Sequence, residues 1–186
     1  MDKLGLKKEK TRLFFVDDSN LGGMKREIGK ELDTIKLFKL LAKKGDRIFF
    51  YYRPREITQK ENQERPFLRY LDFLQNRLWQ ELSREGISLI VFPATKDNED
   101  AMITTDIAIS VYKREWLGLE DDVVEIVLIS GDGGFARILE LAKEEEKKIL
   151  VVAGRESCSK RLTEIADEVL YIQDLVKEHS ELILEH

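Results

Sequence analysis

Two short hydrophobic runs in this chain each lead into an aspartate. Residues 13–16 precede Asp17, and residues 127–129 precede Ser130, Gly131 and Asp132. Short apolar runs that are rich in β-branched and aromatic residues and stop at turn residues are typical of strands buried on both faces, as in a parallel sheet. Since ligands of open α/β sheets bind at the carboxyl ends of the strands, the two aspartates are predicted to converge in one crevice.

Strand-like and helix-like patterns alternate along the chain. Strands are predicted over residues 12–17, 47–52, 88–92, 123–129, 148–153 and 168–172, and helices over 33–44, 66–84, 102–116, 135–146, 159–166 and 173–184. Gly45 is the expected C-cap of the first helix. The alternation predicts one α/β domain of three layers, a Rossmannoid fold whose central parallel sheet has helices on both faces. We assign residues 1–172 to this domain and 173–186 to a C-terminal helix that ends in a possible tag remnant.

The composition excludes several classes of protein. Charged residues make up 36% and hydrophobic residues 42% of the 186 residues, values typical of a folded domain. No apolar run approaches the roughly 20 residues of a membrane span, and residues 1–10 lack the apolar centre of a signal peptide. The single cysteine, Cys158, excludes an internal disulfide and fits a cytoplasmic location. His179 and His186 both lie near the end of the chain, which disfavours a histidine base or a histidine-ligated zinc site.

The charge is unevenly distributed. The net charge of −5 argues against nucleic-acid binding by the whole surface. However, residues 1–60 contain 16 Lys and Arg against 9 Asp and Glu, a net charge of +7, whereas the remainder has a net charge of −12. Residues 1–60 are therefore suited to attract a polyanion. The alternative is that their lysines only solvate helix faces.

The aspartates suggest a divalent-metal site. Asp17 and Asp132 are joined by a third candidate, Asp106, which lies in a helix-like segment after two threonines. Converging carboxylates repel one another unless a cation or a proton lies between them. Three carboxylates with Asn20 and Ser130 nearby suit Mg²⁺ or Mn²⁺, which prefer oxygen ligands. Such an ion lowers the pKa of bound water and positions a phosphodiester for in-line attack.

Each acidic residue also has a purely structural interpretation. Asp132 is placed to cap the helix that follows it, and Asp106 to interact with a helix macrodipole. Asp18 follows Asp17 in a segment expected to be extended, so its side chain should point the other way and lie at the surface. Three further acidic residues are predicted to lie in a solvated loop, with the alternative that one of them reaches the metal: Asp97, Glu99 and Asp100.

Five segments of the chain form an ordered set of motifs. They carry, in turn, a hydrophobic-Asp-x-x-Asn-Leu sequence, an aromatic strand, a Thr-Asp pair before an apolar helix, a Ser-Gly-Asp sequence and a Lys-led apolar strand: residues 15–21, 48–52, 105–109, 130–135 and 147–153. In this order they resemble the NYN domains of the LabA-like group, which are nucleases of the PIN-like fold. The matches cover about residues 11–172, and several motifs in family order are more specific than any one alone.

The resemblance implies a metal-dependent ribonuclease, a hydrolase, with the sheet order 3-2-1-4-5. It also implies that Asp17, Asp106 and Asp132 hold Mg²⁺ or Mn²⁺ and that Asn20 orients the first loop. The chain departs from the family pattern in two places. Gly134 stands where the family has a second aspartate, and the lysine before the helix aspartate is absent. Because Mg²⁺ usually keeps several waters, three carboxylates remain sufficient to hold it.

Basic and aromatic residues near the same edge are candidates for RNA contacts, with single-stranded or structured RNA. The cations suit a salt-sensitive grip on phosphates, and they comprise Lys25, Arg26, Arg53, Arg55, Lys60, Arg65 and Arg69. Three aromatic residues are candidates for stacking on bases: Tyr51, Tyr52 and Phe67. At least one of the two tyrosines is expected in the core.

Other α/β families fit the sequence less well. A receiver domain needs a phospho-accepting aspartate after a later strand, a haloacid-dehalogenase-like phosphatase needs Asp-x-Asp where Ser19 stands, and the spacing of Gly22, Gly23 and Gly29 does not suit a dinucleotide fold. The main alternative is a catalytically weak or inactive RNA-binding or scaffold protein of the same fold. The terminal helix, with Leu175 and Leu182 among its apolar residues, seals either the core or a homodimer.

Overall fold

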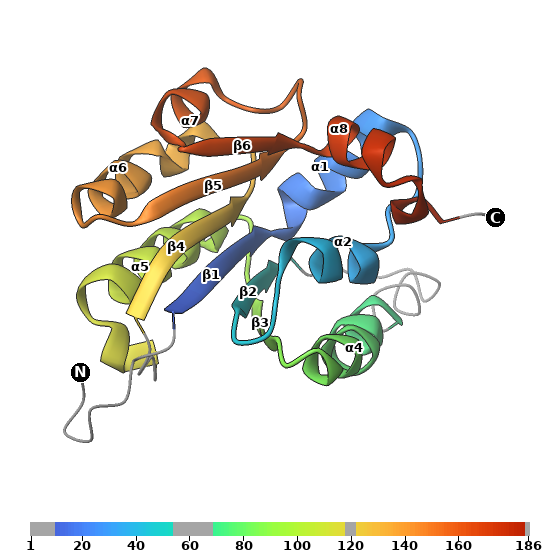
Figure 1. The fold of residues 1–186 in the computed structure, drawn as a ribbon, viewed down its shortest axis with the longest axis horizontal. Coiled ribbons are helices and arrows are strands. Elements are labelled where there is room, and N and C mark those ends of the chain that lie inside the picture. Colours follow the sequence, from blue (N-terminus) through green and yellow to red (C-terminus); the bar gives the residue numbers. More distant parts are fainter. Residues whose placement is uncertain (1–9, 54–68, 118–121, 185–186) are drawn as a thin grey trace.

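A single parallel sheet of six strands forms the centre of the protein (Figure 1). The computed structural model describes residues 10–53, 69–117 and 122–184. In chain order the strands are β1 (Lys10–Asp17), β2 (Arg47–Tyr52), β3 (Ser88–Pro93), β4 (Asp122–Ile129), β5 (Lys148–Ala153) and β6 (Glu168–Tyr171). They lie in the order β3-β2-β1-β4-β5-β6. The predicted order 3-2-1-4-5 is confirmed, and the last predicted strand extends the sheet beyond β5.

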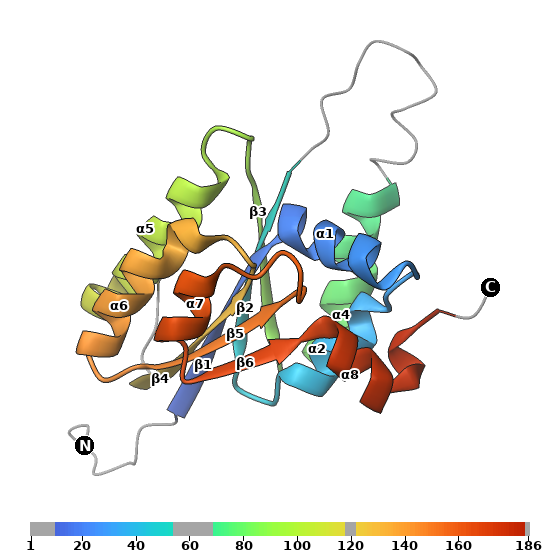
Figure 2. The same cartoon turned by 90° about the horizontal axis from the view of Figure 1, so that it is seen from above.

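Helices cover both faces of the sheet because its central strands are apolar on both faces. On one face lie α5 (Glu99–Tyr112), α6 (Ala136–Glu144) and α7 (Lys160–Ile165), as Figure 2 shows. On the other lie α1 (Asp18–Ile28), α2 (Thr34–Leu41), α4 (Trp79–Arg84) and α8 (Ile172–Glu178). A π-helical segment, Phe73–Leu78, precedes α4, and 3₁₀ turns occupy Arg114–Leu117, Gly133–Phe135 and Ser180–Leu182. The predicted three-layer α/β domain is therefore confirmed.

The helix boundaries correct the sequence analysis in several places. The predicted C-terminal helix over residues 173–184 is α8 only as far as Glu178 and is followed by the 3₁₀ turn Ser180–Leu182. Residues 18–28 form α1, a helix that the sequence analysis did not predict, with Asp17 as its N-cap and Gly29 as its C-cap at a φ of 63°. α2 ends at Leu41, three residues before the predicted end, and Gly45 is not its C-cap but part of the turn before β2. α5 begins at Glu99, three residues before the predicted start, so Glu99 is helical and not part of a loop.

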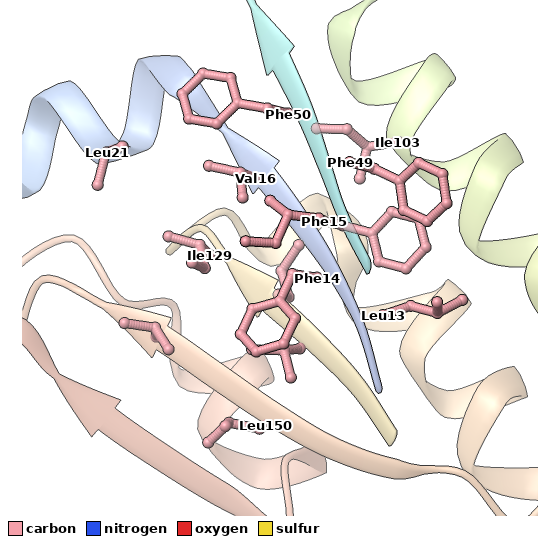
Figure 3. Packing of buried hydrophobic residues seen from close by; sticks show 14 of the residues in the cluster. Leu13, Phe14, Phe15, Val16, Leu21, Phe49, Phe50, Ile103, Ile129 and Leu150 are labelled. Carbon is pink, nitrogen blue, oxygen red and sulfur yellow. The ribbon is translucent and has the colours of Figure 1, made fainter. Parts of the chain in front are cut away.

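Aromatic rings from neighbouring strands stack in the core. The ring centroids of Phe15 and Phe49, which are paired in the β1–β2 register, are 5.3 Å apart. Phe92 on β3 continues the stack, 6.2 Å from Phe49 and 5.2 Å from Tyr51. Figure 3 shows the Phe15 and Phe49 rings side by side and the Phe14 ring elsewhere in the cluster, as expected for adjacent residues of a strand.

The C-terminal segment packs against the rest of the chain. Leu175 on α8 and Leu182 in the last 3₁₀ turn are buried. Leu32 pairs with Ile183 through an antiparallel bridge, and the Asp33 amide donates to the Leu182 carbonyl at 2.7 Å. The segment thus seals the core, one of the two predicted alternatives.

Among the described residues, no helix has the length and apolar character needed to span a bilayer.

Replacing Phe14 by alanine is expected to lower the free energy of unfolding by about 3–5 kcal/mol, because a fully buried aromatic side chain is lost and a cavity remains. Chemical denaturation of Phe14→Ala measures this loss. Trp116→Ala is the matched control, since Trp116 is 72% exposed and its removal should change stability by less than about 0.5 kcal/mol. Equal effects of the two substitutions would contradict the packing described above.

Candidate active site

Asp17 is a buried carboxylate in which both oxygens are engaged. It is the last residue of β1 and is 2% exposed. Its Oδ1 accepts a hydrogen bond from the backbone N–H of Asn20 at 3.0 Å. Its Oδ2 accepts from the side-chain Nδ2 of Asn20 at 2.5 Å and from Ser130 Oγ at 3.0 Å. The Asp-x-x-Asn spacing therefore serves a helix cap, since Asp17 satisfies an N-terminal amide of α1.

Ser130 joins the ends of β1 and β4. Its hydroxyl donates to Asp17 and accepts from the Asp132 amide at 3.1 Å. Asn20 makes a second connection, because its Oδ1 accepts from the Gly131 amide at 3.2 Å. The structure thus places Asp17, Asn20, Ser130 and Asp132 in one hydrogen-bonded group at the carboxyl edge of the sheet.

Asp132 is exposed and caps the turn that follows it. Its Oδ1 accepts a hydrogen bond from the Gly134 amide at 2.7 Å. A Cβ atom on residue 134 would lie 3.2 Å from that same Oδ1, which is a tight contact. The capping interpretation of Asp132 is therefore correct, and capping leaves its side chain at the surface beside Ser130.

Asp106 lies apart from this group in its hydrogen bonding. It is half-buried on α5 and accepts a hydrogen bond from the Tyr51 hydroxyl at 2.6 Å. Burial and then this hydrogen bond raise the pKa of Tyr51. Tyr51 and Tyr52 are both buried, which confirms that at least one belongs to the core. Within the described residues, hydrogen bonds join Asp106 to Tyr51 and not to Asp17 or Asp132.

Glu99 is a site residue that the sequence analysis placed wrongly in a solvated loop. As the first residue of α5 it is only 1% exposed. Its Oε2 accepts from Ser19 Oγ at 2.9 Å and from Arg53 Nε and Nη2 at 3.1 and 2.6 Å. Its Oε1 is buried and, among the described residues, has no hydrogen-bond partner. Burial and, among the neighbouring charges, that of Asp17 raise the pKa of Glu99.

Asp100 adds a fourth carboxylate at the surface of this group. Burial raises the pKa of Asp100, and the negative charges of Asp132 and Asp17 raise it further. The three carboxylates are therefore close enough to interact electrostatically, and Glu99 interacts with Asp17 in the same way. Asp97 is exposed, as predicted. Glu99 and Asp100 do not by themselves indicate a functional site in the sequence, because the helix macrodipole favours acidic residues in the first turn of any helix.

Asp18 is not the surface residue that we predicted. Because α1 begins directly after β1, Asp18 is helical and half-buried, and it accepts a hydrogen bond from the Tyr70 hydroxyl. Burial raises the pKa of Asp18 despite this hydrogen bond and the nearby charge of Lys25. Tyr70 therefore ties the start of α1 to the helical segment before α4.

In the part of the chain that the structure describes, no group of three or more metal-ligating side chains is already gathered around one point. The carboxylates nevertheless influence one another at this edge of the sheet since, in addition to burial, the charge of Asp17 raises the pKa values of Glu99 and Asp100.

Comparison with known families assigns the chain to one of them. The model of the NYN domain matches residues 13–173 of the chain. The chain belongs to the NYN family, a family of PIN-like nucleases. A solved structure, that of a protein of unknown function from Vibrio parahaemolyticus, has a TM-score of 0.59 and 18% sequence identity over 95% of this chain and 97% of that chain. At this identity the likeness supports the fold alone. Among curated proteins we found no match.

Basic residues of the NYN domain lie along α1 and at the end of β2. Lys25 and Arg26 in the last turn of α1, with Lys30 and the acidic Glu31 beyond it, line a groove of about 590 Å³ next to Ile183. Arg53 pairs with Glu99, and Arg69 is exposed. The sequence analysis did not name Arg161, a further basic residue near the Asp132 loop. Its Cδ would lie 3.9 Å from a Cβ atom on residue 133. Four predicted contact residues lie outside the described residues: Arg55, Lys60, Arg65 and Phe67.

A second loop supports the Asp132 loop of this NYN domain. The Ser159 amide donates to the Gly131 carbonyl at 2.9 Å, and a Cβ on residue 131 would lie only 2.5 Å from the Ser157 carbonyl oxygen. The close approach of two backbones explains why glycine follows Ser130. Glu27 on α1 holds the supporting loop, because its carboxylate accepts hydrogen bonds from the Glu156 and Ser157 amides, both at 3.1 Å, and from Gln173 Nε2 at 2.8 Å.

Glu27 should stabilise the domain in a pH-dependent way. Burial alone would raise the pKa of Glu27, but its hydrogen bonds outweigh burial and lower the pKa below the ordinary 4.5. Its stabilising effect is therefore complete above pH 4.5 and is lost as the pH falls through the lowered value. Denaturation of Glu27→Gln at a series of pH values should show a stability deficit that is constant at neutral pH and shrinks in acid. Glu178→Gln is the control, because Glu178 is exposed at the end of α8. A pH-independent deficit for Glu27→Gln would contradict this role.

Proposed function

We propose that this NYN domain is a ribonuclease that hydrolyses RNA phosphodiester bonds with a Mg²⁺ or Mn²⁺ ion held by the carboxylates at the carboxyl edge of the sheet. The observation that supports the proposal is the buried Oε1 of Glu99, near Asp17, which has no hydrogen-bond partner within the described part of the chain. A buried carboxylate oxygen without a hydrogen bond is costly, and a cation is the natural partner for it. Divalent metals are also typical of PIN-like nucleases.

The side chains present fit such an ion. All of the candidate ligands are carboxylates, and hard oxygen donors suit Mg²⁺ and Mn²⁺. Asp17 and Asp132 come from the sequence analysis, and the structure adds Glu99 and Asp100. Asp106 keeps its proposed role on the family resemblance. Four carboxylates at the edge compensate for the acidic residue that Gly134 replaces, since the charge that attracts the cation does not depend on one position.

The protein's own residues hold this site in shape. Asn20 and Ser130 fix the Asp17 carboxylate, and Ser130 also holds the loop that carries Asp132. When bound, a divalent ion supplies charge stabilisation at the phosphate and lowers the pKa of its water. Because Asp17 is already bonded on both oxygens, its orientation changes little on binding, which is the property that a catalytic site requires.

RNA is the proposed substrate, and α1 provides a path for its backbone. Lys25, Arg26 and Lys30 lie at the end of α1 and just beyond it, where their charges suit contacts with phosphates, and the charge of Lys25 also acts on Asp18. The Arg26 side chain lies over this part of α1, because its guanidinium nitrogens would be 3.8 Å from a Cβ atom at either Gly22 or Gly23.

One observation favours a second function, an RNA-binding or scaffold protein without activity. Gly134 replaces an acidic residue of the family motif, and its amide holds Asp132 in a cap. Residual RNA binding with no metal-dependent cleavage is the outcome that this alternative predicts.

Substitutions of the carboxylates separate the two functions. In a cleavage assay with labelled single-stranded RNA and Mn²⁺, Asp17→Asn and Glu99→Gln should each reduce kcat about 100-fold or more, because several kcal/mol of charge stabilisation are lost. Asp174→Asn, an exposed carboxylate paired with Arg155, is the control and should cleave like the wild type. Equal cleavage by all variants would indicate contamination and would favour the RNA-binding alternative.

The basic groove should be visible in the salt dependence of RNA binding. Each phosphate contact on a single strand adds about 0.7 to the slope of log K against log salt concentration. The double variant Lys25→Gln/Lys30→Gln should therefore lower the slope by about 1.4. Lys148→Gln, at the start of β5 on the opposite edge of the sheet, should leave the slope unchanged. If the slope fell for Lys148→Gln and not for the double variant, the RNA would bind at the opposite edge of the sheet and not at the groove beside α1.

A further inference from the structure

Arg53 pairs with the most deeply buried carboxylate of the site. It follows β2 directly, and its guanidinium donates through Nε and Nη2 to one oxygen of Glu99, at 3.1 and 2.6 Å. The side chain of Arg53 is 35% exposed, whereas that of Glu99 is 1% exposed. The guanidinium therefore lies on the outer side of the pair, between Glu99 and solvent.

The charge of Arg53 acts on more than Glu99. Hydrogen bonding and the charge of Glu99 raise the pKa of Arg53, and the charges of Asp17 and Asp100 add to this effect. Among the described residues, the Arg53–Glu99 contact is the ion pair that involves a carboxylate of this site. Arg53 thus supplies the positive charge that the clustered carboxylates otherwise lack.

The two oxygens of Glu99 have opposite environments. Oε2 accepts three hydrogen bonds, from Ser19 and twice from Arg53, while the buried Oε1 accepts none from the described residues. Arg12 binds Asp46 through the same two nitrogens on one oxygen, but the other Asp46 oxygen accepts a backbone hydrogen bond. At Glu99 the other oxygen is buried and has no such partner among the described residues.

We propose that Arg53 is a positioning residue that serves as an internal counter-ion, holding Glu99 in place and competing with a divalent cation for the charge of the carboxylate group. This inference rests on the proposed metal-dependent function and deepens it. A guanidinium and a divalent ion repel each other across one carboxylate, so Arg53 lowers the affinity of the site for metal. The site therefore holds its ion loosely, with the carboxylates kept in register while the ion is absent.

The affinity for Mn²⁺ tests this role without an activity assay. Electron paramagnetic resonance of free Mn²⁺ during titration of the full chain gives the dissociation constants. A neighbouring positive charge lowers the pKa of a carboxylate by about one to three units, and the same repulsion acts on a bound cation. Arg53→Gln should therefore bind Mn²⁺ about tenfold more tightly than the wild type. Arg53→Lys, which retains the charge, should move the affinity back toward the wild-type value. Arg12→Gln is the matched control and should bind like the wild type, since Arg12 pairs with buried Asp46 at the opposite edge of the sheet.

The opposite result would overturn the proposal. If Arg53 only supports the structure of Glu99, Arg53→Gln should bind Mn²⁺ equally or less tightly than the wild type. Arg53→Met, which keeps the apolar stem, is the second variant if Arg53→Gln does not fold, and the same direction is expected for it. Wild-type Mn²⁺ binding that is unaffected by Asp17→Asn would overturn both the counter-ion role and the proposed function. Asp17-dependent binding without tighter binding by the Arg53 variants would overturn the counter-ion role alone.

Discussion

The hydrogen bond from Ser130 to Asp17 is the contact on which the site depends. It joins the ends of β1 and β4, two strands that are 113 residues apart in sequence but adjacent at the centre of the sheet. Adjacent parallel strands end at the same edge, so the order of the sheet decides that these side chains meet. The Asn20–Gly131 hydrogen bond repeats the connection three residues after Asp17 and one residue after Ser130. The packing of the core thereby fixes the positions of polar atoms at the surface.

Holding carboxylates together opposes folding, and the rest of the domain compensates for it. In addition to burial, the negative charge of Asp17 raises the pKa values of Glu99 and Asp100, an unfavourable interaction at neutral pH. The stacked rings of Phe15, Phe49 and Phe92 lie directly beneath this edge in strands β1 to β3. A rigid apolar sheet can carry such a strained surface because its stability is provided elsewhere, as is common at functional sites.

Much of the fold was predictable from sequence because the sheet strands are apolar on both faces. β2 and β5 have the predicted bounds, since each is a continuous apolar run between turn residues. Helix α1 was not predicted because Gly22 and Gly23 are poor helix formers. It forms nevertheless, because Asp17 caps its start, Gly29 caps its end and Leu21 and Met24 bury its inner face.

The site was less predictable than the fold, for a different reason. Asp17, Asn20, Ser130 and Asp132 belong to local motifs at strand ends, so their meeting followed from the topology alone. Glu99 contacts Ser19 and Arg53, which are 80 and 46 residues away, and no local pattern contains that information. Glu99 becomes a candidate only in the folded structure, where its Oε1 is buried and has no hydrogen-bond partner among the described residues.

The same chain shows what a buried carboxylate looks like when its role is structural. Asp46 is 1% exposed at the amino edge, and its Oδ2 accepts from Arg12 Nε and Nη2 and from the Lys43 amide, while Oδ1 accepts from the Arg12 amide. Both oxygens are satisfied, and the arginine and the turn are fixed together. Glu99 is equally buried and also has an arginine, but its Oε1 has no hydrogen-bond partner among the described residues. This difference between two buried carboxylates of one chain is the reason for proposing a cation as the partner of Oε1.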